Sequence, residues 1–401
     1  MNITDVGHLT SDEDEGEDKV EAAAKKEGKT AKEITNFYFK IFKDDLKKLN
    51  ISLPNKFPKA SEHIKEQIDL IKILKKKGFT YTTSDGIYYN TSKFKDYGKF
   101  SRIGKQEAGK RVSMKEKKNI TDFVLWKFSN PPGKRQQEYN PKKYGANFKI
   151  GYPGWHLECS AMSMKYLGEH FDIHTGGQEH IQIHHQNEIA QSEAATGKKF
   201  VNYWLHTAWL TNKGEKISKS KGGLFTISEL EKKDFPPLIF RYLCLTANYN
   251  TPLDFSLESL EAAKTSYNNL KNKILELKTK DEVKTHPILI KEYKTKFLEK
   301  INDDLNIPSA LALIWDLLKE KNINNKDKLN LILTFDKVLG LDLNKIKIEK
   351  INSKIKDLIK QRELARKNKD FKKADLIRDE LLKMNIILED TKSGVKWKKK
   401  S

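Results

Sequence analysis

Three potential metal ligands of different chemistry constrain how the middle of this chain can fold. Cys159 ends the segment Trp155–Cys159, and His184 and Glu188 follow it in the sequence. One sulfur, one nitrogen and one oxygen donor form a mixed set that suits Zn²⁺. His184 and Glu188 are four residues apart, so on a helix they share a face, whereas His185 would point about 100° away. A common ion therefore requires the helix with His184 to pack against the segment with Cys159.

Each of these ligands also has an ordinary explanation. A single cysteine is usually a small apolar core residue, and a His–Glu pair four residues apart is often only a surface pair. The three residues alone do not decide between a metal site and these alternatives. The remaining sequence has to be considered before the site can be interpreted.

Length and composition predict a soluble cytoplasmic protein. The 401 residues are enough for two or three domains. No apolar run approaches the roughly 18 residues of a membrane span, and Met1–Asp5 lacks the pattern of a signal peptide. Two cysteines in the whole chain argue against a disulfide framework and for a reducing compartment.

The net charge of +21 is compatible with a polyanionic partner. Phosphate contacts dominate nucleic-acid affinity, so a nucleic acid would suit this charge. The alternative is a lysine-biased genome, because asparagine is also common here and lysine far exceeds arginine. Charge alone leaves both explanations open.

Hydrophobic periodicity predicts an α/β part followed by helices. Asn2–Val6 has the pattern of a strand end that runs into a loop. The further expected elements are a helical stretch over about 19–49, an amphipathic helix over 60–77, a hairpin within 79–102, and strands at 123–128 and 200–208. From about residue 256 to the end the pattern is helical and strongly charged, which marks a separate helical domain.

Lys216–Ser220 has the composition of a mobile lysine loop. Its two ammonium groups could approach phosphates and stabilise charge on a leaving pyrophosphate, and Gly214, Gly222 and Gly223 would let it move. In a chain this rich in lysine, the same pentapeptide also arises by chance in a solvated loop.

Two further features each have a functional and a structural interpretation. Gly176-Gly177 would allow the backbone to approach a ligand closely, or it is a simple turn. Trp155 and Trp204 could wall a small-molecule pocket, or they are core aromatics.

Together and in this order, these segments resemble the cysteinyl-tRNA synthetases, which are class I aminoacyl-tRNA synthetases. The matching segments are Asn2–Asp5, Asp122–Lys127, Gly154–Met162, Phe171–His174, His184–Ser192 and Lys216–Ser220, with Lys369–Asp375, Ile377–Glu380, Leu388–Thr391 and Trp397 near the C-terminus.

The resemblance implies an α/β fold. It consists of a class I Rossmann-type catalytic domain, N-terminally incomplete, with an inserted α+β subdomain and a C-terminal α-helical bundle. The expected divisions are 1–62 and 154–200 for the two parts of the catalytic domain, 63–153 for the connective insertion, 201–255 for the subdomain with the lysine loop, and 256–401 for a helical tRNA anticodon-binding domain.

The resemblance also implies an activity, in which L-cysteine is activated with ATP to cysteinyl-adenylate and transferred to tRNA-Cys. One Zn²⁺ per chain, held by Cys159, His184 and Glu188, would take the substrate thiolate as a further ligand, and the hard hydroxyl of serine would coordinate poorly. Such a polar bond discriminates by about 10⁴–10⁵, without an editing domain.

Further residues receive roles from the same resemblance. Lys216 and Lys219 would bind the phosphates of ATP, which enters with Mg²⁺, and would act in catalysis. The amino-acid pocket would be formed by Thr4, Trp155, His174 and Trp204. Arg378 and Trp397 would contact tRNA, and the enzyme is expected to be a monomer.

The sequence departs from the family pattern at its start. The family's first βα unit carries a Cys-Gly-Pro segment with a further zinc thiolate and a His-x-Gly-His signature that cradles ATP phosphates at a helix start. Neither occurs here, so we expect three protein ligands for zinc, a reduced phosphate clamp and little activity by this chain alone. A truncated gene or a separate N-terminal fragment would explain the difference. Cys244 falls at a helical position and is expected to be buried core.

Three other functions are compatible with parts of the sequence. A ligase that joins cysteine to an amino-sugar compound would use the same chemistry, but it has no use for the basic helical domain. A non-catalytic tRNA-binding relic would fit the missing segment, although it would not need Cys159, His184 and Glu188. A basic helical RNA-binding protein would explain the charge but not the ordered motifs.

Overall fold

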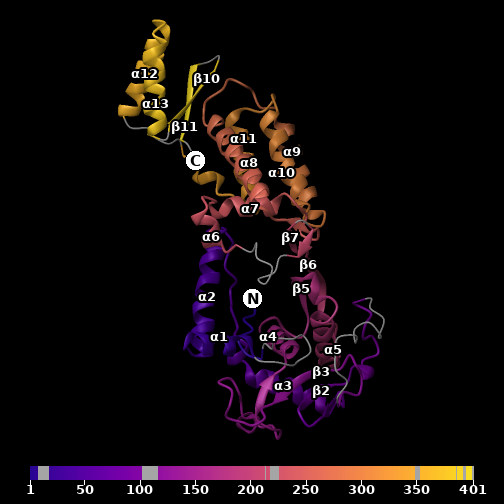
Figure 1. Ribbon diagram of the computed structural model, residues 1–401. Helices are drawn as coiled ribbons and strands as arrows, with labels where there is room; N and C mark the ends of the chain where they lie inside the picture. Colours follow the sequence, from indigo (N-terminus) through magenta and orange to yellow (C-terminus); the bar gives the residue numbers. More distant parts are fainter. Residues whose placement is uncertain are drawn as a thin grey trace. The chain divides into compact units, whose positions relative to one another are not determined.

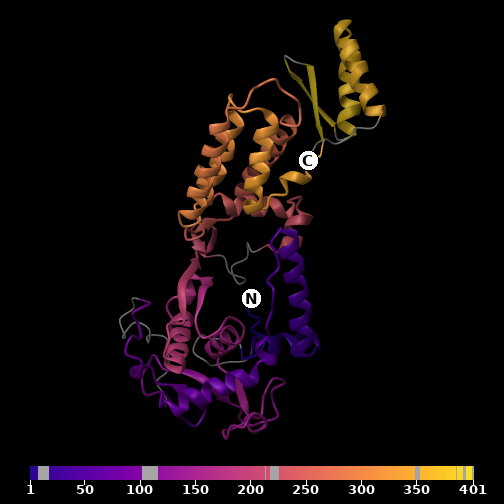
Figure 2. The same ribbon diagram turned by 180° about the vertical axis from the view of Figure 1, so that it is seen from behind.

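Two structural units, residues 1–344 and 345–401, make up the chain. Figures 1 and 2 show the computed structural model, which describes residues 1–7, 18–101, 116–212, 214–216, 225–347, 353–384, 386–391 and 394–399. Among these residues every helix is too short or too polar to span a lipid bilayer.

Two helices, α1 (Lys19–Glu27) and α2 (Ala31–Lys48), occupy the stretch where one helical pattern was expected. Gly28 ends α1 in the left-handed region with a φ of 63°, which glycine adopts without steric cost. Thr30 then starts α2 with a capping box, in which its side chain accepts from the backbone N–H of Glu33 and the Glu33 carboxylate accepts from the N–H of Thr30. The local cap residues thus divide the predicted helix.

A four-stranded antiparallel sheet and three helices enclose a hydrophobic core of the first unit. The strands pair in the order β1 (Thr80–Thr82), β2 (Gly86–Tyr89), β3 (Phe123–Phe128) and β4 (Gly151–Pro153), as the hairpin and strand patterns predicted. The helices are α3 (Ile64–Lys76), α4 (Trp155–Leu167) and α5 (His184–Thr196), which pack on one another (Figure 1). A short 3-10 helix, Ala60–Glu62, precedes α3. The fully buried core side chains include Ile68, Ile71 and Leu74 of α3, Leu125 and Trp126 of β3, Leu157 of α4 and Ala190 of α5.

A parallel strand pair follows the core. β5 (Phe171–Gly177) pairs with β6 (Val201–Thr207), and α5 forms the connection between them. Parallel neighbours need such a crossover because their ends point the same way. The segment predicted as a strand end, Asn2–Val6, forms only an isolated parallel bridge from Ile3 to Lys59.

The last part of the first unit is mainly helical. It also contains a small sheet in the order β8 (Glu215–Lys216), β7 (Leu210–Asn212) and β9 (Leu253–Asp254). The helices are α6 (Ile227–Lys232), α7 (Pro237–Leu245), α8 (Leu257–Glu276), α9 (Pro287–Asn302), α10 (Ile307–Lys319) and α11 (Asn325–Leu339), of which α8 to α11 lie side by side (Figures 1 and 2). Phe297 of α9 and Phe335 of α11 stack with ring centroids 4.1 Å apart.

Arg241 of α7 joins the ends of two helices that are distant in sequence. Its Nε donates to the carbonyl of Leu339 at the end of α11 (2.6 Å), and its Nη1 donates to the carbonyls of Leu49 (2.9 Å) and Asn50 (3.2 Å) after α2. Gly340 completes the contact, since a Cβ there would lie 2.6 Å from Arg241 Nη2. The guanidinium thus donates hydrogen bonds to carbonyl groups that helix ends leave without partners.

We expect Arg241→Leu to lower the free energy of unfolding by about 2–4 kcal/mol, because hydrogen bonds from a charged donor are lost and carbonyl groups are left unpaired. Urea unfolding followed by circular dichroism measures the change. Arg378→Leu is the control, because Arg378 is exposed on α13 (Phe371–Lys383), and it should change the value by less than about 0.5 kcal/mol. Equal destabilisation by both substitutions would show that the Arg241 contacts contribute nothing specific.

The second unit contains two helices and a hairpin. α12 (Ser353–Lys367) packs on α13, and β10 (Ile386–Thr391) pairs with β11 (Gly394–Lys399). Its core consists of Ile355, Leu358, Ile377, Leu381, Ile386 and Leu388. The helical pattern expected up to the C-terminus was wrong for the last strands. In β10 the side chains of Ile386 and Leu388, two residues apart on one face of the strand, join this core.

Candidate metal centre and its histidine cluster

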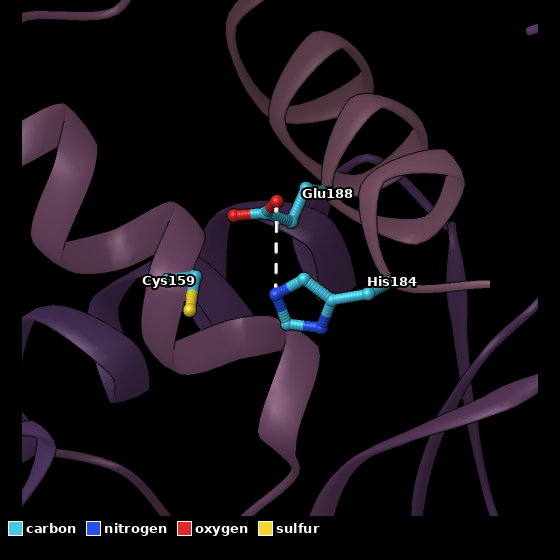
Figure 3. Close-up of side chains that lie close together, drawn as sticks. All are labelled: Cys159, His184 and Glu188. Atoms are coloured by element: carbon cyan, nitrogen blue, oxygen red, sulfur yellow. Dashed lines mark ion pairs between the residues drawn. The ribbon is translucent and has the colours of Figure 1, made fainter. Parts of the chain in front are cut away.

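Cys159, His184 and Glu188 lie together where α4 and α5 pack against each other. Their ligand atoms are all within 4.8 Å of one another, and all three side chains are buried. Figure 3 shows the His184 ring facing the Glu188 carboxylate, with the Cys159 sulfur on the neighbouring helix; His184 Nε2 is 3.7 Å from Glu188 Oε2. The spacing of four residues places His184 and Glu188 on the same face of α5, as the sequence predicted.

The antiparallel sheet fixes the position of Cys159. α4 begins directly after β4, and the N–H of Gly154 donates to the carbonyl of Leu125 in β3 (3.0 Å). A Cβ at Gly154 would lie 2.1 Å from the carbonyl oxygen of Val124, so only glycine permits this close approach. The start of α4 is therefore held on the sheet, and Cys159 follows one turn later.

Several further histidines surround this set, and of these the sequence analysis assigned only His174 to a site. His156 Nδ1 lies 2.9 Å from His184 Nδ1, and His185 Nδ1 lies 2.8 Å from His206 Nε2. His174 Nε2 lies 3.0 Å from Glu188 Oε2. The concentration of histidines between residues 156 and 206 was the available sign of such a cluster, but the sequence does not show which of them meet.

Burial keeps the histidines in the neutral form, which can donate an electron pair to a metal ion. Burial, reinforced by neighbouring histidines, lowers the pKa of His185 to about 2 and the pKa of His184 well below its ordinary value. Burial lowers the pKa of His156 to about 3. The imidazoles are therefore neutral at pH 7, the form that binds metals. Burial, followed by the Glu188 charge, raises the pKa of the Cys159 thiol well above its usual range.

The donor set fits a soft divalent cation. Glu188 Oε1 is buried and has no hydrogen-bond partner in the part of the chain that the structure describes. A carboxylate oxygen without a partner is costly to bury, and a cation or a proton would offset that cost. A metal ion at this point would supply that cation and would replace the proton of the Cys159 thiol.

Three of the four residues predicted for the amino-acid pocket lie around the set. Trp155 has its ring centroid 4.4 Å from that of His184, and His174 and Trp204 meet edge to face at 4.9 Å. Thr4 is half-buried near the start of the chain, where the side chain of Asn2 hydrogen-bonds Cys159.

The other predicted site residues are placed less completely. Lys216 ends β8, whose backbone pairs with β7, and Lys219 lies outside the described residues. Arg378 is exposed on α13, and Trp397 pairs with Leu388 in the C-terminal hairpin. The ATP and tRNA roles of these four residues stay predictions.

The prediction that Cys244 is buried core was wrong. The residue does lie on a helix, α7, but its side chain is exposed. The buried face of α7 is formed by Ile239, Tyr242 and Leu243, and Cys244 falls beyond the edge of this stripe.

Three family models match the chain. The model described as tRNA synthetases class I (C) catalytic domain matches residues 2–265, the DALR domain matches 296–344, and the cysteinyl-tRNA ligase anticodon binding domain matches 350–397.

Curated relatives are similar to nearly the whole chain. A cysteine–tRNA ligase of Treponema denticola is 42% identical over 431 residues, which cover 100% of this chain and 87% of the relative. One of Borrelia garinii is 41% identical with the same coverage. The cysteine–tRNA ligase 1 of Burkholderia lata is 42% identical and covers 98% of this chain and 82% of the relative.

A solved structure shares the fold. The methionyl-tRNA synthetase of Mycobacterium tuberculosis, bound by methionyl-adenylate, matches with a TM-score of 0.53 at 13% identity, covering 82% of this chain and 79% of that chain. This likeness and the class I catalytic model confirm the predicted fold class, an α/β catalytic domain followed by helical domains.

Proposed function

The chain belongs to the cysteine–tRNA ligase family of class I aminoacyl-tRNA synthetases, and we propose that it activates L-cysteine with ATP and transfers it to tRNA-Cys. The observation that carries the proposal for the amino acid is the buried set of Cys159, His184 and Glu188. Cysteine differs from serine and alanine in its thiol, and a soft metal is the partner that recognises a thiol best.

Cys159, His184 and Glu188 would hold the zinc ion, which when bound supplies an electrophilic position for the thiolate of cysteine. His156 orients the His184 ring through the contact between their Nδ1 atoms. Trp155 packs against His184 with the two rings tilted by 35°. These neighbours position the metal ligands, so that the site is preorganised before the amino acid enters.

Positively charged side chains would bind the two substrates that carry phosphate groups, ATP and tRNA. Lys216 and Lys219 would contact ATP, where ammonium groups stabilise the charge that moves onto pyrophosphate. The second unit would bind tRNA, and its exposed Arg378 lies on α13 within the segment that matches the anticodon-binding model. The monomeric state, the separate N-terminal fragment and the low activity of the chain alone stay predictions.

We expect the chain to bind tRNA-Cys more tightly than a tRNA with another anticodon, with an affinity that falls steeply as salt rises. Arg378→Ala should weaken tRNA-Cys binding roughly 10-fold, because one charged contact is lost. Filter binding at several salt concentrations measures both effects.

Lys40→Ala is the matched control, because it removes one charge from an exposed position on α2 of the first unit. It should leave tRNA affinity nearly unchanged. Equal affinity for both tRNAs, with no effect of Arg378→Ala, would contradict the proposed role of the second unit.

A further inference from the structure

A second group of potential ligands shares Glu188 with the first. The ligand atoms of His174, His185 and Glu188 also lie within 4.8 Å of one another. His174 projects from β5, whereas His185 and Glu188 belong to α5. This group contains no sulfur.

The distances in this group suit ligands of one ion. Glu188 Oε2 lies 3.0 Å from His174 Nε2 and 3.8 Å from His185 Nε2. Two donors at about 2.0–2.1 Å from a tetrahedral ion stand roughly 3.3 Å apart, so the two observed separations bracket that value. The longer one exceeds the reach of an N–H···O hydrogen bond, so a proton shared between His185 and Glu188 does not explain their approach.

The surroundings of His185 are those of a metal ligand. Its Nδ1 is engaged by His206 Nε2 at 2.8 Å, and this contact turns Nε2 toward Glu188. Histidines that bind metals almost always have their second nitrogen engaged in this way. The ring of Trp204 packs 4.7 Å from His185 and 4.9 Å from His174, measured between centroids, and walls the group on one side.

Glu188 has enough oxygen atoms for two ions. Oε2 is approached by the histidines of both groups, since His184 Nε2 also lies 3.7 Å from it, and Oε1 is buried without a hydrogen-bond partner among the described residues. A bridging carboxylate commonly joins two ions about 3.5–4 Å apart. The same side chain can therefore belong to both ligand sets.

We propose that His174, His185 and Glu188 form a second, thiol-free site for a divalent transition-metal ion such as Zn²⁺ or Co²⁺, bridged through Glu188 to the site of Cys159. Its nitrogen and oxygen donors bind soft ions less tightly than a thiolate does, so it fills after the first site. An ion there would engage His174, a predicted residue of the amino-acid pocket, so that excess metal would obstruct the pocket. The inference does not depend on the tRNA ligase activity.

Cobalt titration of the metal-free full-length chain tests the proposal. Equilibrium dialysis counts the bound Co²⁺, and the near-ultraviolet band of a thiolate bound to Co²⁺ reports the first site separately. The wild type should bind about two ions, the second more weakly. His185→Gln should bind about one with the thiolate band retained, and Cys159→Ala should bind about one without the band.

Two further variants serve as an independent test and as a control. His174→Gln removes a ligand from β5 instead of α5 and should reproduce the stoichiometry of His185→Gln, so a folding defect in one variant does not decide the result. His170→Gln, at an exposed histidine outside both sets, should bind like the wild type.

A wild-type protein that saturates at about one ion, with both histidine variants unchanged, would overturn the second site. In that case a thiolate band that persists would leave the first site and the proposed function intact. Absence of the band in the wild type would instead contradict the first site.

Discussion

Zinc-loaded protein is expected to bind L-cysteine at least about 10³-fold more tightly than L-serine. The proposed zinc ligands Cys159, His184 and Glu188 are buried, so an added ligand would compete with little water there. A thiol loses its proton to a soft metal near neutral pH, whereas a hydroxyl does not. Sites that form one ligand-specific polar bond reach discriminations of about 10⁴–10⁵.

Isothermal titration of the zinc-loaded chain with each amino acid measures this preference. L-2-aminobutyrate, which replaces the thiol by a methyl group, is a matched ligand and should bind as weakly as serine. Removal of zinc with a chelator should abolish the preference, and added zinc should restore it. Similar dissociation constants for cysteine and serine with zinc present would contradict thiol selection by this site.

The local geometry of the zinc set could be predicted because it depends on short spacings. His184 and Glu188 occupy one helical face simply because they are four residues apart. The N-terminal helix break at Gly28 and Thr30 was equally local, and the Thr30–Glu33 capping box was visible in the sequence. It was overlooked because the apolar pattern continues across it.

Contacts that depend on the packing of separate elements could not be predicted. His206 meets His185 only because β6 lies parallel to β5, with Gly176 opposite His206, and α5 crosses between them. No spacing in the sequence encodes that register. The same holds for Arg241, whose partners Leu49 and Leu339 come from helices far away in the sequence. The terminal hairpin was missed because its alternating lysines and apolar residues also fit a charged helix.

Cys159→Ser is expected to weaken the tight zinc site by more than about 10²-fold, since even the loss of an outer partner of a metal ligand costs 10–100-fold. The substitution keeps the size of the side chain nearly constant but replaces a thiolate by a hydroxyl that does not ionise.

Cys159→Ser is also expected to reduce the number of protons that are released when zinc binds. Burial raises the pKa of the Cys159 thiol, so the metal-free protein holds this proton at neutral pH and zinc must displace it. Tight binding should therefore strengthen as pH rises, and this dependence should weaken in the variant.

Competition with a chromophoric chelator at several pH values measures the affinity and its pH dependence. Cys244→Ser is the matched control, because it removes the other cysteine of the chain from an exposed position on α7. It should bind zinc like the wild type. The weaker group of His174, His185 and Glu188 retains its ligands in both variants, so only the high-affinity phase of the titration should disappear in Cys159→Ser. If the high-affinity phase disappeared in both variants, or in neither, Cys159 would not be a zinc ligand.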